Sequence, residues 1–407
     1  MKIRVDVAVV GGGAAGMAAA KAAAETGVKA ILLERERHLG GVLDQCIHPG
    51  FGLHRYRAEL TGPEFSYRLL QEVEASGAEI FTEAAVVGFC GEPELKVVSP
   101  RGLFRVKAKA VVWATGARER PFGPLLIAGT RPAGIFTAGL AQKLVNIYGL
   151  LPGKCALIVG SGDIGLIMAR RLFLEGIEVK GVVEIKPFPG GLLRNVVQCL
   201  DDFGIPLMLQ HTVVQVHGQK RLSGVTLIEV DENGRFIPKT EKFVEVDTLI
   251  LSVGLIPERR LLEQYLFREH LKQGILVNNY FQTCIPWLFL AGNAVSIFDL
   301  VDTVAKIGEV AGRNAALFTQ GLLQSGRLVY IQRGANVTAV VPQFIVPGTP
   351  VTLYLRVSQP FSQARIRVSG VYEKKYIGLR PAEMVEISLP PEATEGFSEV
   401  TVEVVPE

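Results

Sequence analysis

A thiol and two imidazoles lie close together in this sequence, at Cys46, His48 and His54. A thiolate can cycle through sulfenic acid, and an imidazole can donate or accept a proton near neutral pH. These three side chains are therefore the candidate catalytic residues. The alternative for Cys46 is a small buried side chain without chemistry, and for each histidine it is a structural role.

Two basic residues follow in the same segment, Arg55 and Arg57. They can bind an anionic substrate or solvate the start of the next helix. We favour solvation, because isolated surface arginines usually face water.

The cysteine spacing argues against a metal centre. The five cysteines are Cys46, Cys90, Cys155, Cys199 and Cys284, and no two of them form a CxxC or CxxxxC pair. Iron–sulfur clusters and structural zinc sites need such local pairs. We therefore expect no metal and no local redox disulfide.

A glycine-rich turn near the amino terminus indicates a second kind of chemistry. In VDVAVVGGGAAG, Gly11, Gly13 and Gly16 have the GxGxxG spacing where an apolar strand enters a helix. The first glycine permits the tight turn, the second lets backbone amides approach a pyrophosphate, and the third lets the helix pack on the strand. Ala14 and Ala15 then lie at the helix amino end, where the dipole favours negative charge.

The residues after this turn support a dinucleotide site. An alanine-rich helix over 14–26 is followed by a strand over 29–33 that ends on Glu34. A carboxylate about twenty residues past the turn can accept a hydrogen bond from a ribose 2′-hydroxyl. The alternative, a β-α-β unit without a cofactor, is disfavoured by this context.

The same pattern occurs a second time. A short strand over 155–159 precedes Gly160, Gly162 and Gly165, and the next strand ends on Glu184. Asp163 and Ile164 would start the intervening helix, which runs through Leu174. An acidic side chain at the strand end accepts from a free 2′-hydroxyl and repels a 2′-phosphate, so the pattern predicts NAD(H) rather than NADP(H).

Further strands and helices must position these turns. We expect a helix over 65–76, a strand edge over 80–89 and a hairpin over 94–106. Strands over 110–114, 248–253 and 287–290 lead into glycine-containing turns, and a helix over 303–320 follows.

Several motifs in this order resemble one family. GGGAAG, Glu34, VVWATGARERP and LFLAGNAV are similar to the signatures of the two-dinucleotide flavoprotein oxidoreductases, the pyridine-nucleotide-disulfide reductase superfamily. The resemblance covers roughly the first four-fifths of the chain. It implies a first Rossmann domain that binds FAD and an inserted second one that binds NAD(P)H.

The resemblance extends to site residues. The implied FAD-binding residues are Gly11, Gly13, Ala14, Ala15, Gly16, Glu34, Arg35, Gly41, Val86, Ala114, Thr115, Gly116, Gly292, Asn293, Asp302 and Thr303. The implied NAD-binding residues are Gly160, Gly162, Asp163, Ile164, Gly165, Glu184 and Gly254. Asn293 stands where the family usually has an aspartate that holds the ribityl chain. The amino end of the helix after Asp302 should face the flavin pyrimidine, where its dipole stabilises negative charge.

The chain departs from the disulfide reductases of this superfamily. Those enzymes carry two cysteines directly after a Gly-Gly step, and here Leu43 and His48 occupy the corresponding positions after Gly40 and Gly41. Cys46 falls on neither position. The resemblance therefore leaves Cys46 as a lone redox thiol or a buried cysteine, and lets His48 and His54 protonate an acceptor or contact the flavin.

Three longer motifs resemble those of a narrower group within this superfamily. GGVLDQCIHPGFGLHRYRAELTGPEF, GSGDIGLIMARRL and AGNAVSIFDLVDTV resemble the FAD/NAD-linked companions of glycerol-3-phosphate-dehydrogenase-like flavoproteins. This group is related to sarcosine oxidase alpha subunits and to amino-acid or opine dehydrogenases. It implies an NADH:acceptor oxidoreductase that exchanges electrons with a second flavoprotein subunit, and an oligomer.

Three functions remain open on the sequence. The first is an NADH dehydrogenase subunit, or an alpha subunit of an amine or amino-acid dehydrogenase, with a partner flavoprotein. The second is a self-sufficient NADH oxidase that makes hydrogen peroxide. The third is an FAD-holding scaffold without catalysis, which the intact second glycine motif and Glu184 disfavour.

Length, charge and hydropathy limit the number of domains, the kind of partner and the location of the chain. The 407 residues are too many for one core, and the net charge of +3 with no basic run gives no sign of a nucleic-acid partner. We expect no membrane span and no signal peptide, because apolar runs are interrupted early and the first one is already a strand. A cytoplasmic protein is the default expectation.

The carboxy-terminal segment differs in character. Short alternating runs over 351–357, 364–368, 385–389 and 399–405 are separated by proline and glycine turns, as in a small β-sandwich. We expect it to contact another subunit or shield the active-site mouth, or to be a passive stabilising appendage.

The predicted fold class is α/β, with two three-layer Rossmann-like domains, one inserted in the other, and a small all-β domain. The FAD domain comprises 1–117 and 257–327, the NAD(H) domain 118–256, and the β domain 328–407.

Overall fold

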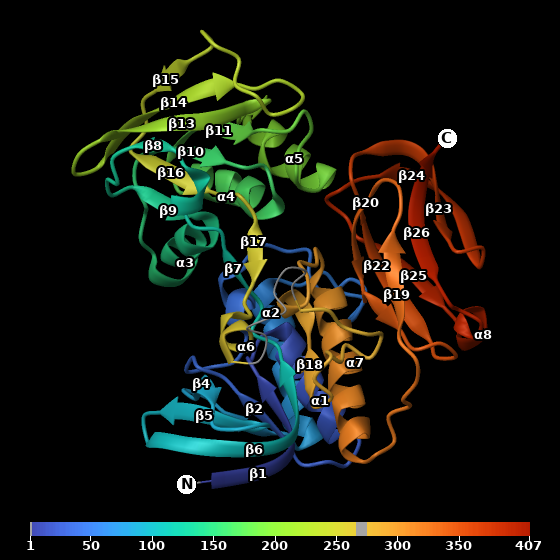
Figure 1. Cartoon of the computed structure of the whole chain (residues 1–407). Helices are drawn as coiled ribbons and strands as arrows, with labels where there is room; N and C mark the ends of the chain where they lie inside the picture. The colour runs from blue at the N-terminus through green and yellow to red at the C-terminus, as the bar shows by residue number, and fades with distance from the viewer. Residues whose placement is uncertain (1, 266–274) are drawn as a thin grey trace. The chain divides into compact units, whose positions relative to one another are not determined.

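The chain folds in two units in the computed structural model, which describes residues 2–265 and 275–407. One unit comprises Met1–Ala117 and Pro257–Glu407, and the other comprises Arg118–Ile256. In Figure 1 the second unit is the green and yellow-green part of the ribbon. Each unit contains one of the two glycine motifs.

The first unit is built on a seven-stranded sheet with the order β3-β2-β1-β6-β5-β4, and β18 pairs with β6. Its strands are β1 (Lys2–Val10), β2 (Ala30–Leu33), β3 (Glu79–Phe81), β4 (Ala85–Phe89), β5 (Glu94–Ser99), β6 (Gly102–Trp113) and β18 (Leu288–Leu290). The strands β3, β2, β1, β6 and β18 are parallel neighbours. The β4-β5-β6 portion is antiparallel.

Strand β6 contains two elements that were predicted to be separate. The expected hairpin arm ending at 106 and the expected strand over 110–114 are one strand of 12 residues. Residues 105–109 alternate between exposed and buried, whereas the last four residues of the strand are all buried. The outer half lies at the hairpin edge, and the inner half lies in the core between β1 and β18.

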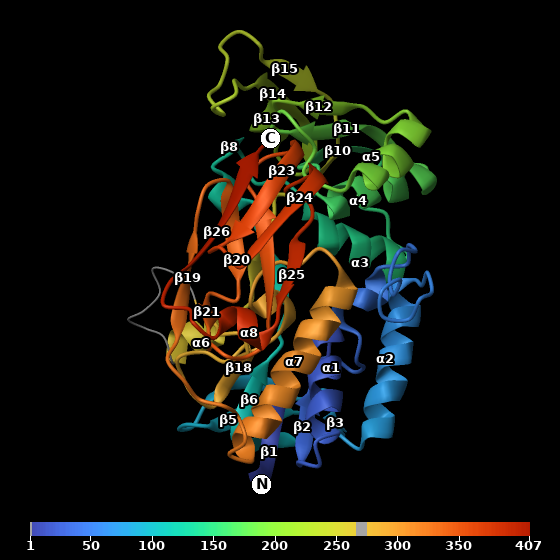
Figure 2. The same cartoon turned by 90° about the vertical axis from the view of Figure 1, so that its right-hand side faces the viewer.

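Helices α1 (Ala14–Ala24) and α7 (Val301–Thr319) pack closely on this sheet, as Figure 2 shows. The contact depends on small residues. A side-chain β-carbon at Gly308 would lie 2.2 Å from the Ala15 carbonyl oxygen, and one at Gly312 would lie 2.1 Å from that of Ala19. The two backbones can therefore approach only because both positions are glycine.

Helix α2 (Gly62–Ser76) begins earlier than predicted. Thr61 and Glu64 form a capping box, in which each side chain bonds the other residue's backbone N–H. Pro63 in the first turn lacks the N–H that would otherwise need a partner. The helix ends at Gly77, which is left-handed with φ +80°. Helix α6 (Arg260–Tyr265) and the 3₁₀ turns Gly41–Gln45 and Gly292–Ala294 complete this part.

The carboxy-terminal strands of the first unit form two sheets around a separate apolar core. One sheet has the order β21-β19-β26-β23-β24, and the other has the order β20-β22-β25. The elements are β19 (Val329–Arg333), β20 (Val337–Val341), β21 (Phe344–Ile345), β22 (Val351–Val357), β23 (Phe361–Val368), β24 (Tyr372–Leu379), β25 (Val385–Leu389), α8 (Pro391–Thr394) and β26 (Val400–Pro406). The alternating runs predicted as strands are strands.

The second unit repeats the strand–turn–helix pattern of the first. Its parallel sheet has the order β12-β11-β10-β16-β9. The elements are β9 (Ile135–Thr137), α3 (Ala138–Tyr148), β10 (Cys155–Val159), α4 (Asp163–Leu174), β11 (Glu178–Glu184), α5 (Leu193–Cys199), β12 (Leu207–Leu209) and β16 (Thr248–Leu251), with 3₁₀ turns at Gly123–Leu125 and Asp201–Phe203.

A second sheet in this unit was not predicted. It has the order β15-β14-β13-β8 and comprises β8 (Ala128–Gly129), β13 (His211–Gly218), β14 (Leu222–Glu229) and β15 (Lys242–Val244). Its strands β13 and β14 carry buried residues on one face, including Val216 and Val225. These pack with Leu157 and Leu249 of the parallel sheet in one apolar core.

The chain passes between the units along two paired strands, β7 (Ala117–Glu119) and β17 (Leu255–Pro257). On the first unit's side, the Glu258 N–H donates to the Gly116 carbonyl oxygen at 2.9 Å. On the second unit's side, the Arg120 N–H donates to the Gly254 carbonyl oxygen at 3.1 Å.

Candidate cofactor-binding and active site

The first glycine turn has the close contacts that its spacing predicts. Gly11 is left-handed (φ +103°), and a β-carbon there would lie 2.6 Å from the Ala114 carbonyl oxygen. A β-carbon at Gly16 would lie 1.7 Å from the Gly11 carbonyl oxygen. Around Gly13, in contrast, a β-carbon would meet no atom within 4 Å. The turn is therefore packed tightly on the sheet side and open at the amino end of α1.

The amino end of α1 is left without a side-chain cap. Its N-cap is Gly13, and no side chain accepts a hydrogen bond from the first turn, where Ala14 and Ala15 lie. Helix α2 in the same unit is capped by Thr61 and Glu64. Uncapped N–H groups beside an open glycine are the geometry that a phosphate needs. The residues present thus fit the pyrophosphate of a dinucleotide.

Glu34 ends β2 beside this turn. It is buried (6% exposed), and its carboxylate accepts the N–H of Gly12 at 2.6 Å and that of Glu36 at 2.7 Å. Two backbone donors keep the carboxylate oriented. Each oxygen retains acceptor capacity for a hydroxyl donor.

A Gly-Gly step lies directly over the turn. Gly40 and Gly41 are both left-handed, and the Gly40 N–H donates to the Gly12 carbonyl oxygen at 2.9 Å. A β-carbon at Gly41 would lie 3.3 Å from the Gly13 α-carbon. Gly41 thus belongs to the same cluster as the glycine motif.

The second glycine turn repeats these constraints. Gly160 is left-handed (φ +93°), and a β-carbon there would lie 2.1 Å from the Ser252 carbonyl oxygen. A β-carbon at Gly165 would lie 2.5 Å from the Gly160 carbonyl oxygen. Gly162 is the N-cap of α4 and, like Gly13, leaves this helix without a side-chain cap.

Glu184 has the same surroundings as Glu34. It is 7% exposed and accepts the backbone N–H groups of Ser161 at 3.0 Å and Lys186 at 3.1 Å. The Ser161 hydroxyl donates to the same carboxylate at 2.5 Å. The amino group of Lys186 lies over the Phe188 ring, 5.6 Å from its centroid.

A second Gly-Gly step, which was not predicted, covers the second turn. The Gly190 N–H donates to the Ser161 hydroxyl at 2.7 Å, and a β-carbon at Gly191 would lie 2.8 Å from an Asp163 carboxylate oxygen. The signal was present in the sequence. Gly40 and Gly190 each follow their strand-end glutamate by six residues, from 34 to 40 and from 184 to 190.

The two predicted residues at the start of α4 differ in role. The Asp163 carboxylate accepts the Leu192 N–H at 2.8 Å and the Asn195 side-chain amide at 2.6 Å. It therefore holds the segment after the Gly-Gly step. Ile164 is half-buried and packs against the core of the parallel sheet.

The predicted FAD-binding residues that follow β6 contact the segment by which the chain returns from the second unit to the first. The Thr115 hydroxyl donates to the Glu258 carbonyl oxygen at 2.6 Å. Ala114 is buried against Gly11, and Gly116 is left-handed with φ +71°. In the other unit Gly254 is also left-handed (φ +101°).

The turn after β18 leads into α7. Gly292 has φ +58°, and a β-carbon there would lie 2.6 Å from the Ala15 β-carbon. The Asn293 side-chain oxygen accepts the Phe298 N–H at 3.0 Å. Asn293 therefore shapes this turn, which lies beside the start of α1.

Asp302 connects the start of α7 to the segment that carries the candidate catalytic residues. Its carboxylate oxygens accept the N–H of Arg55 at 2.8 Å and that of Gly52 at 3.2 Å. Thr303 is half-buried next to it in the first helical turn. No side chain caps this helix at its amino end either.

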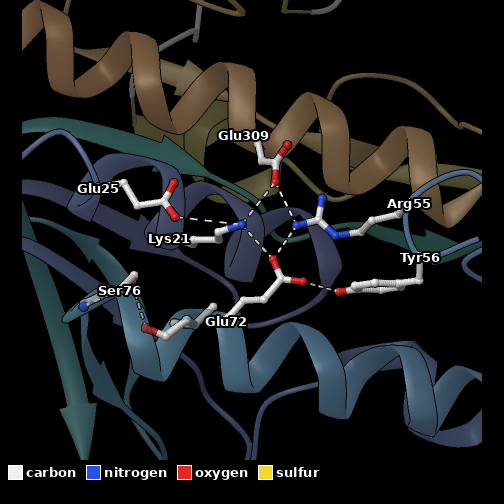
Figure 3. Close-up of polar contacts among 9 residues, drawn as sticks. Lys21, Glu25, Arg55, Tyr56, Glu72, Ser76 and Glu309 are labelled. Carbon is white, nitrogen blue, oxygen red and sulfur yellow. Dashed lines mark hydrogen bonds and ion pairs between the residues drawn. The ribbon is translucent and has the colours of Figure 1, made fainter.

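Arg55 belongs to a charge network that joins three helices (Figure 3). Its guanidinium pairs with Glu72 of α2 at 2.7 Å and with Glu309 of α7 at 2.8 Å. Lys21 of α1 pairs with Glu72 at 2.7 Å, and the Tyr56 hydroxyl donates to Glu72 at 2.7 Å. The interpretation that Arg55 solvates a helix start is wrong, because its side chain is 14% exposed and its Nη2 pairs with Glu72 and Glu309.

The network shifts the pKa values of its members. Burial would raise the pKa of Glu72, but hydrogen bonds from Lys21, Tyr56 and Arg55 lower it. Burial would lower the pKa of Arg55, but the pairs with Glu309 and Glu72 raise it. Burial, together with the bond to Glu72, raises the pKa of Tyr56 to about 12. Near neutral pH, Arg55 and Glu72 are therefore ionised and Tyr56 is neutral.

The three candidate catalytic residues lie on one segment but differ in exposure. Cys46 is half-buried, and its thiol donates to the Val42 carbonyl oxygen at 3.2 Å. His48 is half-buried, with Nδ1 3.0 Å from the Pro49 carbonyl oxygen and its ring 5.0 Å from that of Phe51. His54 is exposed.

Two further predicted residues lie apart from the glycine cluster. Arg35 is 77% exposed and pairs with its neighbour Glu36 at 3.5 Å. Val86 is half-buried in β4, opposite Val97. Its strand is tied to β2 through the Ala84 N–H, which donates to the Glu34 carbonyl oxygen at 2.7 Å.

The sequence also matches a family model over this site. The model for the family described as pyridine nucleotide-disulphide oxidoreductase matches residues 5–308. The chain belongs to this family. The pyridine nucleotide-disulphide oxidoreductase family generally binds FAD and NAD(P). The match confirms the predicted family and oxidoreductase class, and the parallel strands in the sheets of the two units confirm the predicted α/β fold class. The match ends within α7, so strands β19–β26 lie beyond it.

Two relatives of this chain are named as subunits. Hydrogen cyanide synthase subunit HcnB of Pseudomonas aeruginosa is 29% identical over 76% of this chain and 69% of its own length. Sarcosine oxidase subunit alpha of Rhizobium meliloti is 28% identical over 62% of this chain. The match covers only 24% of that sarcosine oxidase subunit.

A solved structure has the same fold. Thioredoxin reductase of Lactococcus lactis superposes on this chain with a TM-score of 0.62 at 20% identity. The superposition covers 78% of this chain and all of that one (100%).

The part of the chain that the structure describes contains neither a membrane-spanning helix nor a cluster of metal ligands. No helix within 2–265 and 275–407 is long and apolar enough to cross a membrane. Over the same residues, histidine, cysteine, aspartate and glutamate side chains form no group of three that could hold a metal ion.

Proposed function

We propose that this chain is an FAD-dependent NAD(H) oxidoreductase that passes electrons between NADH and a second protein. One observation carries the proposal. Each unit has a glycine turn pressed onto its sheet, an uncapped helix amino end and a buried glutamate that accepts two backbone N–H groups. A chain that used only one dinucleotide would not need this arrangement twice.

In this proposal FAD binds the domain formed by 1–117 and 257–327. The amino end of α1, with Gly11, Gly13, Ala14, Ala15 and Gly16, binds the pyrophosphate, and Glu34 accepts from the ribose. Gly41, Thr115, Gly116, Gly292, Asn293, Asp302 and Thr303 complete the site in this proposal, and Arg35 and Val86 are included only from the family resemblance. Bound FAD supplies a hydride acceptor that can release electrons singly or in pairs.

The segment of Cys46, His48 and His54 would then lie at the start of α7. Asp302 fixes its backbone through two hydrogen bonds. Of the three side chains, the imidazoles are suited to donate a proton to an electron acceptor, and His54 is open to solvent.

NAD(H) binds the domain formed by 118–256 in this proposal. Gly160, Gly162, Asp163, Ile164, Gly165, Glu184 and Gly254 provide the site. A buried, oriented carboxylate at Glu184 accepts from a free 2′-hydroxyl and repels a 2′-phosphate. We therefore expect NADH to be preferred over NADPH.

The proposed electron partner is a second flavoprotein subunit, of the glycerol-3-phosphate-dehydrogenase-like kind. The two relatives support a partner, because both are named as subunits. An alternative within the same class is the alpha subunit of an amine or amino-acid dehydrogenase.

The test is an anaerobic titration of the FAD-loaded protein with NADH and, separately, with NADPH, following the absorbance of oxidised flavin. Bleaching by NADH at much lower concentration than by NADPH supports the proposal. Bleaching by neither overturns it and supports an FAD-holding scaffold. Equal bleaching by both overturns the assignment of Glu184.

A second measurement identifies the acceptor. Oxygen uptake and hydrogen peroxide formation are followed with NADH and the isolated chain. Slow turnover that a co-purifying flavoprotein accelerates supports the partner. Fast turnover by the isolated chain supports a self-sufficient NADH oxidase instead.

A further inference from the structure

The turn between β18 and α7, residues 291–300, is contacted by residues that lie beyond the part of the chain matched by the family model. This turn contains Asn293 and ends at Leu300, the N-cap of α7. Asn293 closes it internally by accepting the Phe298 N–H at 3.0 Å. What keeps the other side of the turn in place is the carboxy-terminal β domain.

Arg356 of β22 makes the central contact. One of its guanidinium nitrogens, Nη2, donates to the Asp299 carboxylate at 2.7 Å and to the Ile297 carbonyl oxygen at 3.1 Å. The other, Nη1, donates to the Pro381 carbonyl oxygen. The second Asp299 oxygen accepts the Met384 N–H at 2.9 Å. Both carboxylate oxygens of Asp299 are thus bound by the β domain.

This ion pair differs from the surface pairs of the same domain. The Arg356 and Asp299 side chains are 22% and 14% exposed. Arg365, on strand β23, pairs with Glu407 and Glu373 but remains 46% exposed. A shielded pair with additional hydrogen bonds is worth more than an exposed one, and losing one partner leaves the other charge uncompensated.

Apolar and helical contacts reinforce the same face. The buried rings of Phe298 and Tyr354 meet edge to face, with centroids 5.4 Å apart. Lys306, in the second turn of α7, pairs with Glu386 of β25. The β domain therefore contacts the turn and the start of the helix together.

A second attachment prevents the domain from rotating about this contact. The buried Asn279 side chain donates to the Thr349 hydroxyl at 2.8 Å and accepts the Val346 N–H at 2.9 Å. The Val277 N–H donates to the Gln343 side chain at 3.0 Å. Two separate hydrogen-bonded attachments make the β domain a fixed support.

We propose that Arg356 is a positioning residue of the flavin site, through which the carboxy-terminal β domain fixes the turn 291–300 and the start of α7. This inference rests on the proposed FAD site, which includes Asn293, Asp302 and Thr303. The β domain is then a working part of the cofactor site, rather than a passive appendage.

The experiment compares Arg356→Gln with Arg365→Gln in the full chain. The dissociation constant for FAD is measured by flavin fluorescence, and the visible circular dichroism and midpoint potential are measured at saturating FAD. We expect Arg356→Gln to raise the dissociation constant by about tenfold or more and to change both flavin signals. Arg365→Gln should match the wild type in all three.

The flavin signals separate positioning from simple stabilisation. If Arg356→Gln lowers only the melting temperature of the cofactor-free protein, and FAD affinity, dichroism and potential are unchanged, the inference is overturned. If Arg356→Gln does not fold, Asp299→Asn is measured in the same way. This variant keeps the shape of the side chain but loses the charge, and unchanged flavin signals again overturn the inference.

Failure of the proposed function has a different signature. A wild-type chain that binds no FAD refutes both the function and the inference. A wild-type chain that binds FAD and is bleached by NADH, with an Arg356→Gln variant identical to it, refutes the inference alone.

Discussion

At the scale of single residues, Glu184 shows how a carboxylate is prepared for recognition. Its oxygens receive two backbone N–H groups and the Ser161 hydroxyl before any ligand arrives. The donors fix the side chain, and burial strengthens its field. Glu34 in the other unit likewise accepts two backbone N–H groups, although the corresponding position offers no hydroxyl donor, because Gly12 stands where the second unit has Ser161.

We expect Glu184→Gln to raise the dissociation constant for NADH by about tenfold and to weaken discrimination against NADPH, because the amide lacks the charge that repels a 2′-phosphate. Both constants are obtained from the anaerobic titration. Glu178→Gln, at the exposed start of the same strand, is the matched control. An unchanged NADH/NADPH ratio in Glu184→Gln would contradict the prediction.

Cys46→Ser should leave NADH-driven flavin reduction within about twofold of the wild type, since the thiol makes a hydrogen bond to the Val42 carbonyl oxygen that a hydroxyl also makes. The rate is measured by stopped-flow absorbance under anaerobic conditions. Cys90→Ser, at an exposed cysteine, is the control. A large loss of reduction or turnover confined to Cys46→Ser would instead establish thiol chemistry.

At the scale of elements, the close contact of α1 and α7 depends on two glycines. Gly312→Ala should lower the free energy of unfolding by about 1–3 kcal/mol, because the new methyl group meets the Ala19 carbonyl oxygen. The higher helix propensity of alanine offsets about 1 kcal/mol of this effect. Chemical denaturation measures the difference.

The exposed position Arg313, one residue further along α7, provides the comparison. Arg313→Ala changes the same helix without adding volume against α1, so its stability should stay near that of the wild type. Equal stability of Gly312→Ala and the wild type would show that the helices can separate without loss.

The charge network of Glu72 joins α1, α2, α7 and the segment of Arg55. The pKa of Glu72 is lowered in the folded protein, so its contribution to stability is present above the ordinary value of 4.5 and is lost as pH falls through the folded pKa. We expect Glu72→Gln to lower the free energy of unfolding by about 1–3 kcal/mol at neutral pH.

The pH dependence distinguishes this effect from a simple packing defect. Between about pH 6 and about pH 3, the wild type should lose more stability than Glu72→Gln, which has no carboxyl to protonate there. Glu79→Gln, at an exposed pair with Lys29, is the control. Parallel pH curves for the wild type and Glu72→Gln would contradict the prediction.

At the scale of the whole molecule, buried residues define which parts unfold together. Val341, Val346 and Tyr354 of the carboxy-terminal part pack into the same core as β1, α1 and α7. The second unit has its own cores. The β domain also has a core of its own. The shared residues and the Arg356–Asp299 pair nevertheless join it to the first unit, so it should unfold with the FAD site and apart from the second unit.

FAD at about 100 times its dissociation constant should stabilise the first unit by about 2.7 kcal/mol and leave the second unit unchanged, because it binds only the first. Calorimetry should resolve two transitions, of which only one moves with FAD. Hydrogen exchange should show β19–β26 protected together with β1. Faster exchange of β19–β26 than of β1 in the FAD-loaded protein would be the contrary result.

The sequence predicts the parts of the site whose chemistry is local. The glycines at 11 and 160 and the glutamates at 34 and 184 follow from short motifs with fixed offsets. Arg55 was misjudged because its partners Glu72 and Glu309 lie on two helices whose packing no local pattern specifies. The bond from Arg55 to Asp302 spans 247 residues.

The fold shows the same division. The repeated β-α-β pattern and the alternating carboxy-terminal strands were predicted, whereas the β13–β15 sheet was not. The continuity of β6 was also missed, because its periodicity changes along one strand. The second Gly-Gly step, at Gly190, lies as far after Glu184 as the first lies after Glu34. It could have been predicted only by aligning the two halves of the chain.

The route of the chain at Gly116 and Glu258 has a consequence for protein engineering. The second unit is flanked by Ala117 and Pro257, and the next residues outward, Gly116 and Glu258, are joined by one backbone hydrogen bond of 2.9 Å within the first unit. The whole nucleotide-binding insert is therefore a cassette with adjacent ends. A short glycine linker can close the gap after its removal, and another module with neighbouring termini can be spliced in without stretching the host.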